Sequence, residues 1–476
     1  MATPRRALAI TALGTFVVLA AFTMPLVTVN ETAAGLGAGA SGRTWILSSM
    51  SIGLGAFLLT AGRLADDYGR RRAFVLGSVV LALGALLGAV APGTATFVLA
   101  RIVQGIGGAA LTAASLGIIG HTFQSPVERS RATAVWGASL GAGIAAGPLL
   151  SAGLTRLHSW RDVYVVLLAA AVALAIAGRG LDEYRSDTPT RPDLPGVLAL
   201  VLGMSALLAG LTEGRQGWAS PLVIALLVIG VVLLVAFVVI EDRSTHPMLE
   251  LALFRIPAFV AVTVAALATG AGVIGLLSYL SGFVGAAYAM SSWTASLLFL
   301  AWSATSAVVS IAARRLPDAV TGRARLAGSL LLIGAGLLLL TDLSTSATPA
   351  RFLPGLLVAG VGSGVLNAAL GRESVASVPP HQAGLGSGAN NTARYLGSAL
   401  GVTVVSVLAS PSGGATTQAL VSGWNRAAVV TAGVSLVGAL AVLLVGEPAG
   451  GPALDPEVGR SESAPGRRAG ASRRRP

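Results

Sequence analysis

Fourteen long apolar stretches, separated by short charged or turn-rich segments, constrain the fold of this chain more than any other feature. The hydrocarbon core of a bilayer is about 30 Å thick and takes about 20 helical residues, which matches the length of these stretches. Only 11% of the 476 residues are charged, too few to cover a water-soluble body of this size. We therefore expect an all-α integral membrane protein with 14 transmembrane helices. Their approximate limits are 8–29, 44–63, 74–91, 96–119, 132–154, 163–178, 194–213, 220–240, 258–284, 293–313, 326–341, 352–371, 384–408 and 427–446.

The arginines predict the topology. The net charge is +12 and every basic residue is Arg, but the arginines cluster in alternate loops rather than on one surface, which favours the positive-inside rule over nucleic-acid binding. These loops are therefore cytoplasmic. An even number of spans places both termini in the cytoplasm, as in a multi-pass protein of the plasma (inner) membrane. The clusters are Arg5–Arg6, Arg70–Arg72, Arg129–Arg131, Arg179–Arg191, Arg243–Arg255 and Arg314–Arg325.

Several classes of chemistry have no residues to carry them. The chain has no Cys and only four scattered His, so we expect neither disulfides nor a metal site. It has no Lys, and a phosphate-binding loop of the Gly-Lys-Ser/Thr type is therefore excluded. The spans contain no cluster of His with carboxylates and no sign of a polar ring, so an intramembrane enzyme and a channel are both disfavoured. We expect no cofactor.

The segment after the second span reads Gly-Arg-Leu-Ala-Asp-Asp-Tyr-Gly-Arg-Arg-Arg at 62–72. Gly62 allows close helix approach, and Asp66 can pair with Arg70 one turn later or cap a neighbouring helix. A generic positive-inside turn would need no such spacing. This spacing around Gly62, Asp66, Gly69 and Arg70 resembles the signature between helices two and three of the major facilitator superfamily.

Two further segments resemble the same family. Arg101 and Gln104 in span four are similar to its buried-Arg motif, and an Arg in hydrocarbon is a functional candidate unless it snorkels to the surface. In span five, Gly143, Gly147 and Pro148 resemble a motif of its antiporter branch, although small-residue helix packing alone explains the glycines.

The segments at 211–218 and 241–255 resemble those flanking the extra helix pair of the fourteen-span drug/proton antiporters, and 314–323 weakly repeats the 62–72 signature. The resemblance implies two six-helix pseudo-symmetric bundles with an inserted helix pair. We expect an N-terminal bundle at 1–178, the insert at 179–257, a C-terminal bundle at 258–446 and a basic tail at 447–476. A solvated, disordered tail is favoured over lipid or partner binding.

The resemblance implies a monomeric exporter of drug-like or antibiotic-like amphiphiles that works by alternating access and is driven by protons. One departure weakens the coupling: the acidic residue that the family carries midway along helix one falls on Ala21. Glu31 is the nearest replacement, although an end residue of this kind is usually solvated. A uniporter, facilitator or differently coupled transporter on the same fold is therefore the alternative.

Span thirteen carries a polar stripe at helical spacing, formed by Ser387, Asn391, Arg394, Ser398 and Gly401. This face should look into protein or a cavity rather than lipid, and interhelical hydrogen bonding and cavity lining explain it equally well. The substrate and coupling candidates are thus Arg101, Gln104, Glu31, Asn391 and Arg394. Arginines without a matching acid repel lipophilic cations, so we expect a neutral or weakly anionic substrate.

Overall fold

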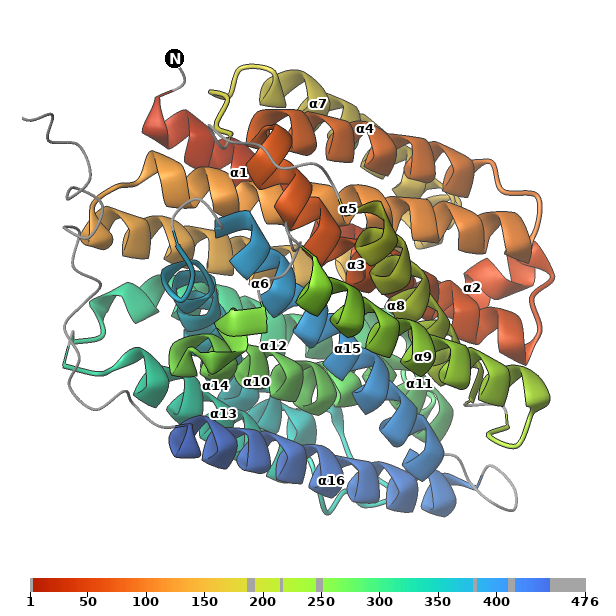
Figure 1. Ribbon diagram of the computed structural model, residues 1–476. Coiled ribbons are helices and arrows are strands. Elements are labelled where there is room, and N and C mark those ends of the chain that lie inside the picture. Colours follow the sequence, from red (N-terminus) through yellow and green to blue (C-terminus); the bar gives the residue numbers. More distant parts are fainter. Residues whose placement is uncertain are drawn as a thin grey trace, which may run out of the picture. The chain divides into compact units, whose positions relative to one another are not determined.

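The computed structural model describes residues 3–185, 193–214, 217–244, 251–317, 319–379, 383–409 and 416–445. Every regular element in these ranges is a helix (Figure 1). The predicted tail at 447–476 and Asp318 in the 314–323 repeat lie outside them. The all-helical class predicted from the apolar stretches is confirmed for the described chain.

Each of the fourteen predicted stretches contains a helix. Within the described ranges twelve helical segments are long and apolar enough to cross a membrane, whereas α7 and α13, with 17 residues each, are shorter than the usual span. The helices are α1 (Pro4–Thr23), α2 (Pro25–Leu36), α3 (Ala40–Tyr68), α4 (Arg70–Ala89), α5 (Thr94–Thr122), α6 (Pro126–Leu157), α7 (Asp162–Gly178), α8 (Leu194–Gly214), α9 (Pro221–Arg243), α10 (Pro257–Thr269), α11 (Gly275–Tyr288), α12 (Ser292–Ala312), α13 (Gly322–Leu338), α14 (Pro349–Ala376), α15 (Ala383–Ala409) and α16 (Thr417–Leu444). Short 3₁₀ turns η1 (Leu251–Arg255) and η3 (Ala313–Arg315) precede α10 and follow α12, and a π-helical turn η2 (Gly270–Ile274) joins α10 to α11.

The first predicted span, at 8–29, is helical but is not one continuous helix. The helix breaks between Thr23 and Pro25 and resumes as α2, which has a second irregularity at Thr28 (φ −116°, ψ 18°). Pro25 has no amide hydrogen, so it cannot continue the hydrogen-bond ladder of α1, and its ring crowds the preceding turn. The sequence holds the cause of this break, because proline at this depth favours a kink.

Buried apolar side chains form two large clusters and one smaller one. The first cluster draws on residues 7–181 with Tyr395, and the second on residues 261–442. The third joins α3, α8, α9, α10 and α15 through residues such as Ile52, Met204 and Leu385. Helices α8 and α9 therefore contact the rest of the described chain mainly through the third cluster.

The surface of the helices is apolar, as a lipid environment requires. Figure 1 shows α8 and α9 lying side by side, and α9 makes its extensive contacts with α8 alone. On α9 a row of branched aliphatic residues is exposed, including Val228, Val231, Val232 and Val235. In a soluble protein so continuous an apolar surface would drive association, whereas lipid tails solvate it.

Candidate functional site

A cavity with a volume of about 390 Å³ lies among α1, α2, α3, α8, α11 and α15. This volume falls within the range of pockets that bind drug-sized ligands. Its walls combine apolar and hydroxyl-bearing side chains, and Arg43 is the single charged residue among the described lining residues. Those residues are Phe22, Leu26, Val29, Arg43, Leu47, Ser48, Ser51, Ile52, Leu208, Thr212, Ser278, Tyr279, Ser398, Ala399, Val402 and Ser406.

A second, smaller cavity of about 30 Å³ adjoins the first and shares Phe22, Leu26 and Ser278 with it. Arg394 and Tyr395 from α15 contribute to its wall. The Phe22 and Tyr395 rings meet edge to face with centroids 5.6 Å apart, which links α1 to α15 beneath the large cavity. We refer to the two cavities together as the central cavity.

Arg394 brings a buried positive charge to this region. Its Nη1 donates to Oδ1 of Asn367 at 3.2 Å, and Nδ2 of Asn367 donates to the hydroxyl of Ser306 at 3.3 Å. All three side chains are buried, so a neutral amide and a hydroxyl hold a guanidinium away from water. A ligand acceptor could improve the electrostatics of such a group, because no carboxylate is paired with it among the described ion pairs.

The polar stripe on α15 faces protein, as predicted. Ser387, Asn391, Arg394 and Ser398 are buried, and Gly401 lies against the backbone of Ala271. The residues of the stripe differ in what they contact. Arg394 and Ser398 line the central cavity, whereas Asn391 donates to the carbonyl of Ser387 at 3.0 Å. Asn391 lines neither part of the central cavity.

Arg101 is also buried, and it lies behind the wall rather than in it. Its Nη1 donates to the Ala21 carbonyl and to Oε1 of Gln104, both at 2.7 Å, and its Nη2 donates to the Phe22 carbonyl at 3.3 Å. Nε2 of Gln104 in turn donates to the Gly84 carbonyl at 3.0 Å. Arg101 has no exposed surface, so the alternative that its side chain snorkels to the membrane surface is excluded.

The break in α1 explains the partners of Arg101. In an intact helix the Ala21 carbonyl would accept from the amide of residue 25, but that residue is Pro25. The last regular bond of α1 runs from the Met24 amide to the Ala20 carbonyl. The Arg101 guanidinium supplies the missing donor, and the negative end of the α1 dipole partly offsets its charge.

A similar arrangement links α6 back to α1. Pro148 inside α6 cannot donate to the Ile144 carbonyl, and the Thr23 hydroxyl lies 3.3 Å from that oxygen. The same hydroxyl is also within reach of the Leu19 carbonyl at 3.0 Å, so its single hydrogen is shared. Gly143 and Gly147 permit this contact, because a Cβ at Gly143 would clash with the Phe16 carbonyl and one at Gly147 with Thr23. Close packing of α1 and α6 is thus the observed role of both glycines.

Asp66 and Arg70 tie α3 to the beginning of α15. Asp66 Oδ1 accepts from Arg70, with Nε at 2.8 Å and Nη2 at 2.7 Å, and Oδ2 accepts from the Leu385 amide at 3.0 Å. Arg70 Nη1 also donates to the Gly117 carbonyl of α5 at 2.7 Å. The structure thus contains both of the interactions that the sequence offered as alternatives for Asp66, the pair with Arg70 and a bond to an amide in the first turn of a neighbouring helix. We call Asp66, Arg70 and the Leu385 amide the α3–α15 latch.

The latch and the central cavity lie at opposite ends of the same two helices. The cavity uses Arg43 to Ile52 of α3, and Asp66 follows about 20 Å further along the helix. On α15 the latch is in the first turn and the cavity begins at Arg394. Between them Gly388 approaches the Leu58 backbone so closely that its Cβ would lie 2.6 Å from the Leu58 oxygen. Gly62 is buried in α3 on the way to the latch.

Gly69, which lies between α3 and α4, has a backbone conformation that favours glycine. Its φ is +123°, which residues with a Cβ rarely adopt, and its Cβ would lie 2.6 Å from Oε1 of Glu183. The same Glu183 oxygen accepts from the Arg71 amide at 3.0 Å and caps the start of α4. Glycine is therefore needed here both for the backbone angle and for space.

The acidic candidate Glu31, like Glu213 at the end of α8, lies outside the site. Glu31 is exposed on α2 and lines neither cavity, so the structure does not bring it to Arg101 or Arg394. Glu213 accepts from Nε1 of Trp45 at 2.7 Å and ties the end of α8 to α3. The sequence reasoning missed Arg43, Tyr279, Tyr395 and Asn367, although Asn367 in an otherwise apolar span is the same signal that revealed Arg394.

Comparison with known proteins decides the family. The family model described as "Major Facilitator Superfamily" matches residues 11–402. The chain belongs to the major facilitator superfamily. It is therefore a multi-pass membrane transporter, not an enzyme, as the 62–72 signature and Arg101 indicated.

Two relatives and one solved structure show which transporters the chain resembles. The chain is 34% identical over 429 residues to the puromycin resistance protein pur8 of Streptomyces alboniger, covering 85% of this chain and 84% of the relative. It is 31% identical over 404 residues to the multidrug resistance protein Stp of Mycobacterium tuberculosis, covering 84% and 75%. Its fold resembles that of the human organic anion transporter MFSD10 (TETRAN), with a TM-score of 0.66 at 18% identity, covering 93% of this chain and 100% of that one.

Proposed function

We propose that this transporter exports drug-like or antibiotic-like small amphiphiles by alternating access. The observation that carries the proposal is the central cavity, which is large enough for such a molecule and is bounded by helices from both large hydrophobic clusters. The printed names of the relatives support it, because pur8 confers puromycin resistance and Stp is a multidrug resistance protein. The Thr23 and Arg101 contacts at the two prolines join α1 to α6 and to α5 beside the cavity.

The proposed conformation opens toward the outside. Arginine-rich loops define the cytoplasmic side by the positive-inside rule, and the latch lies beside Arg70 to Arg72. The cavity extends the other way, to Val29, Arg43 and Ser406. A closed latch inside and a cavity outside correspond to the state from which cargo leaves, and breaking the Asp66 contacts would accompany the return.

We propose a neutral or weakly anionic substrate. Arg43 and Arg394 are the charged residues on the described cavity walls, and neither wall has a carboxylate. In a low-dielectric site an unmatched guanidinium repels lipophilic cations and attracts carboxylate or phenolate groups. The hydroxyls of Ser278 and Ser398 add neutral hydrogen-bonding groups for orientation.

Proton coupling is the proposed energy source. The group that carries the proton is not a carboxylate of the described cavity walls. Position 21 is alanine and the described cavity walls hold no carboxylate, so the proton that enters in exchange for the substrate needs a group outside these walls, for which the exposed Glu31 is the nearest candidate. A uniporter or differently coupled transporter is the alternative function, favoured by Ala21 itself.

We propose the following organisation for the whole chain. It has 14 spans, with α7 and α13 as the two short ones, in bundles at 1–178 and 258–446 with an insert at 179–257, and with both termini in the cytoplasm. The separate hydrophobic clusters at 7–181 and 261–442 support this division. We further propose that the protein acts as a monomer in the plasma membrane.

Reconstitution tests the function and the coupling together. Proteoliposomes with an acidic interior and a pH-sensitive dye are exposed to cationic, neutral and anionic compounds. Substrate-triggered proton efflux with uptake of neutral or anionic compounds is the expected result. Transport without proton flux would establish the uniporter alternative, and transport restricted to lipophilic cations would contradict the proposed substrate class.

A further inference from the structure

Two buried side chains on the latch side of the central cavity lack the hydrogen bonds that their chemistry requires. Asn390 of α15 is 2% exposed, and its Oδ1 accepts from no described donor. Trp136 of α6 is 1% exposed, and its Nε1 donates to no described acceptor. A buried amide or indole N–H without a partner costs free energy, so each such group in a folded protein needs an explanation.

Other tryptophans and asparagines in the described spans are paired. The indole N–H groups of Trp302 and Trp424 each donate at 3.0 Å. The side-chain amides of Asn367 and Asn391 donate at 3.3 and 3.0 Å. The missing bonds therefore belong to two particular positions and are not a general property of buried amides and indoles in this protein.

Asn390 lies in the half of α15 that the latch closes. It comes between Leu385 of the latch and Arg394 of the central cavity. It shares a helix face with Ser387, whose hydroxyl is likewise buried without a described partner. A Cβ at Gly386 would clash with the backbone of α14, and α3 approaches α15 on the other side, so this face is enclosed between α14 and α3.

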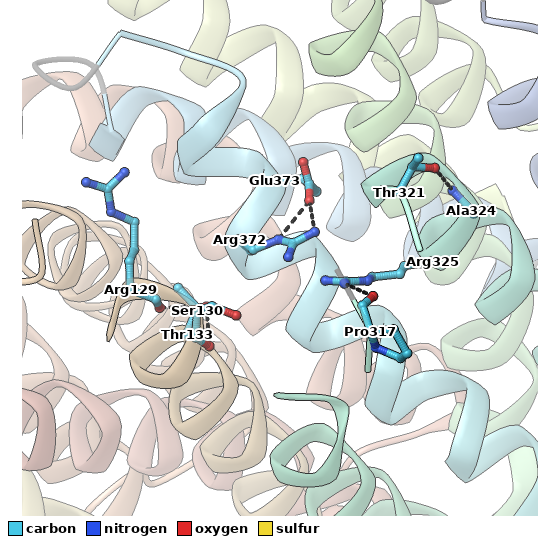
Figure 2. Close-up of polar contacts among 9 residues, drawn as sticks. All are labelled: Arg129, Ser130, Thr133, Pro317, Thr321, Ala324, Arg325, Arg372 and Glu373. Atoms are coloured by element: carbon cyan, nitrogen blue, oxygen red, sulfur yellow. Dashed lines mark hydrogen bonds and ion pairs between the residues drawn. The ribbon is translucent and has the colours of Figure 1, made fainter. Parts of the chain in front are cut away.

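Trp136 reaches the same part of the protein from α6. Its ring packs against Gly371 of α14, where a Cβ would lie 3.2 Å from the indole. Charged groups begin nearby, because Figure 2 shows Arg372, which follows Gly371, pairing with Glu373, and Arg129 near the beginning of α6. By the positive-inside rule this end of α6 is cytoplasmic, so the indole N–H lies just behind the cytoplasmic surface.

We propose that Asn390 and Trp136 line the inward-facing part of the transport path, where they hydrogen-bond the substrate as it enters from the cytoplasm. The inference rests on the proposed alternating access, in which opening the latch admits water and cargo to this half of the protein. Water and substrate then supply the partners that both groups lack in the latched conformation. An amide and an indole N–H carry no charge, so this entry site takes a neutral molecule with hydrogen-bond donors and acceptors.

Thermal unfolding of the full chain in nanodiscs tests the energetic consequence. In the latched conformation the unpaired amide of Asn390 carries a cost that a side chain of similar shape without polar atoms removes. We expect Asn390→Leu to raise the unfolding temperature by about 1–3 °C. Asn391→Leu is the matched control, because Asn391 is similarly buried but donates a hydrogen bond, and it should lower the unfolding temperature.

Cysteine labelling tests whether this half opens. The chain contains no cysteine, and Ser387→Cys is a conservative change on the face of Asn390. With the latch intact the thiol should react slowly with a water-soluble maleimide, and in the Asp66→Asn background about tenfold faster. A transported neutral compound should slow this faster reaction. Ser435→Cys on α16, buried against Gly272 of η2, is the control and should react slowly in both backgrounds.

Slow labelling at position 387 in both backgrounds would overturn the proposal, as would equal losses of stability in Asn390→Leu and Asn391→Leu. Fast labelling that no transported compound slows would leave a water path but overturn the entry site. If reconstitution finds no transported compound, the export proposal fails, whereas the change in labelling still decides whether this half opens. If Asp66→Asn does not purify, Arg70→Gln removes the other side of the same pair and takes its place.

Discussion

Arg101 and Arg394 are both buried in helical spans, yet their partners differ in kind. Arg101 binds the carbonyls that the Pro25 break leaves open, whereas Arg394 binds the amide of Asn367 and borders the central cavity. Backbone partners at a proline indicate a role in holding the scaffold, and a single side-chain partner beside a cavity indicates a group available to a ligand. Burial of an arginine in a span is therefore not sufficient to assign it to a substrate site.

The largest expected effect comes from Arg101→Ala. Removing the guanidinium leaves the Ala21 carbonyl without its donor, which should cost about 3 kcal/mol and lower the unfolding temperature by several degrees. Transport of every substrate should fall together. Thermal unfolding in detergent and a transport assay with neutral and anionic compounds measure the two effects.

A second substitution tests the reason for that loss. Pro25→Ala restores an amide that can donate to the Ala21 carbonyl, so Arg101→Ala/Pro25→Ala should lose less stability than the two single losses added together. Strict additivity would show that Arg101 acts on something other than the proline break. In that case the conclusion that Arg101 compensates for the break at Pro25 would be wrong.

Arg394→Gln should change selectivity more than stability. We expect transport of anionic compounds to fall about tenfold, with neutral compounds little affected, because one charge at a low-dielectric wall is lost. Initial rates over a series of substrate concentrations measure this. An equal loss for neutral and anionic compounds would make Arg394 another scaffold residue.

The latch gives a moderate effect of another kind. Asp66→Asn keeps a hydrogen-bonding side chain but removes the charge that pairs with Arg70 and caps Leu385. Transport should slow about tenfold without a change of selectivity, since the cavity walls are untouched. Asp67→Asn one residue later is the matched control, and a similar slowing there would separate the effect from the latch.

The smallest expected effect comes from Thr23→Val, which removes the hydroxyl near the Ile144 carbonyl. A loss of about 0.6–1 kcal/mol is expected, in keeping with hydrogen bonds inside membranes. The loss should be smaller in a Pro148→Ala background, where the α6 amide replaces the hydroxyl. An unchanged loss there would mean that the Leu19 bond of Thr23 carries the effect.

The sequence predicted the helices well because a bilayer demands long apolar stretches and leaves little choice of structure. The Asp66–Arg70 pair was also predictable, because the two residues are four positions apart and side chains at this spacing are neighbours on a helical turn. The tie from Asp66 to Leu385 joins residues 319 positions apart, and no local pattern specifies it. The sequence also contained Pro25 and Arg101, but only the packing of α5 on α1 shows that one compensates for the other.

The cavity walls were the least predictable part. Arg43 lies at the beginning of α3 and resembles any loop arginine, and Glu31 looked like a substitute acid although it lines neither part of the central cavity. Asn391 shares a helical stripe with Arg394, yet it bonds its own helix. Helical spacing determines which residues share a face, but the neighbouring helices determine which part of that face borders a cavity.

Substrate protection of an introduced cysteine is the most direct test of the central cavity as the transport site. The chain contains no cysteine, so Ser398→Cys introduces a single thiol on the cavity wall, and Ser346→Cys provides an exposed control. We predict that a transported compound slows the reaction of a small maleimide with the thiol at position 398 and leaves the reaction at 346 unchanged. Labelling at 398 that no transported compound slows would contradict the assignment of this cavity as the substrate site.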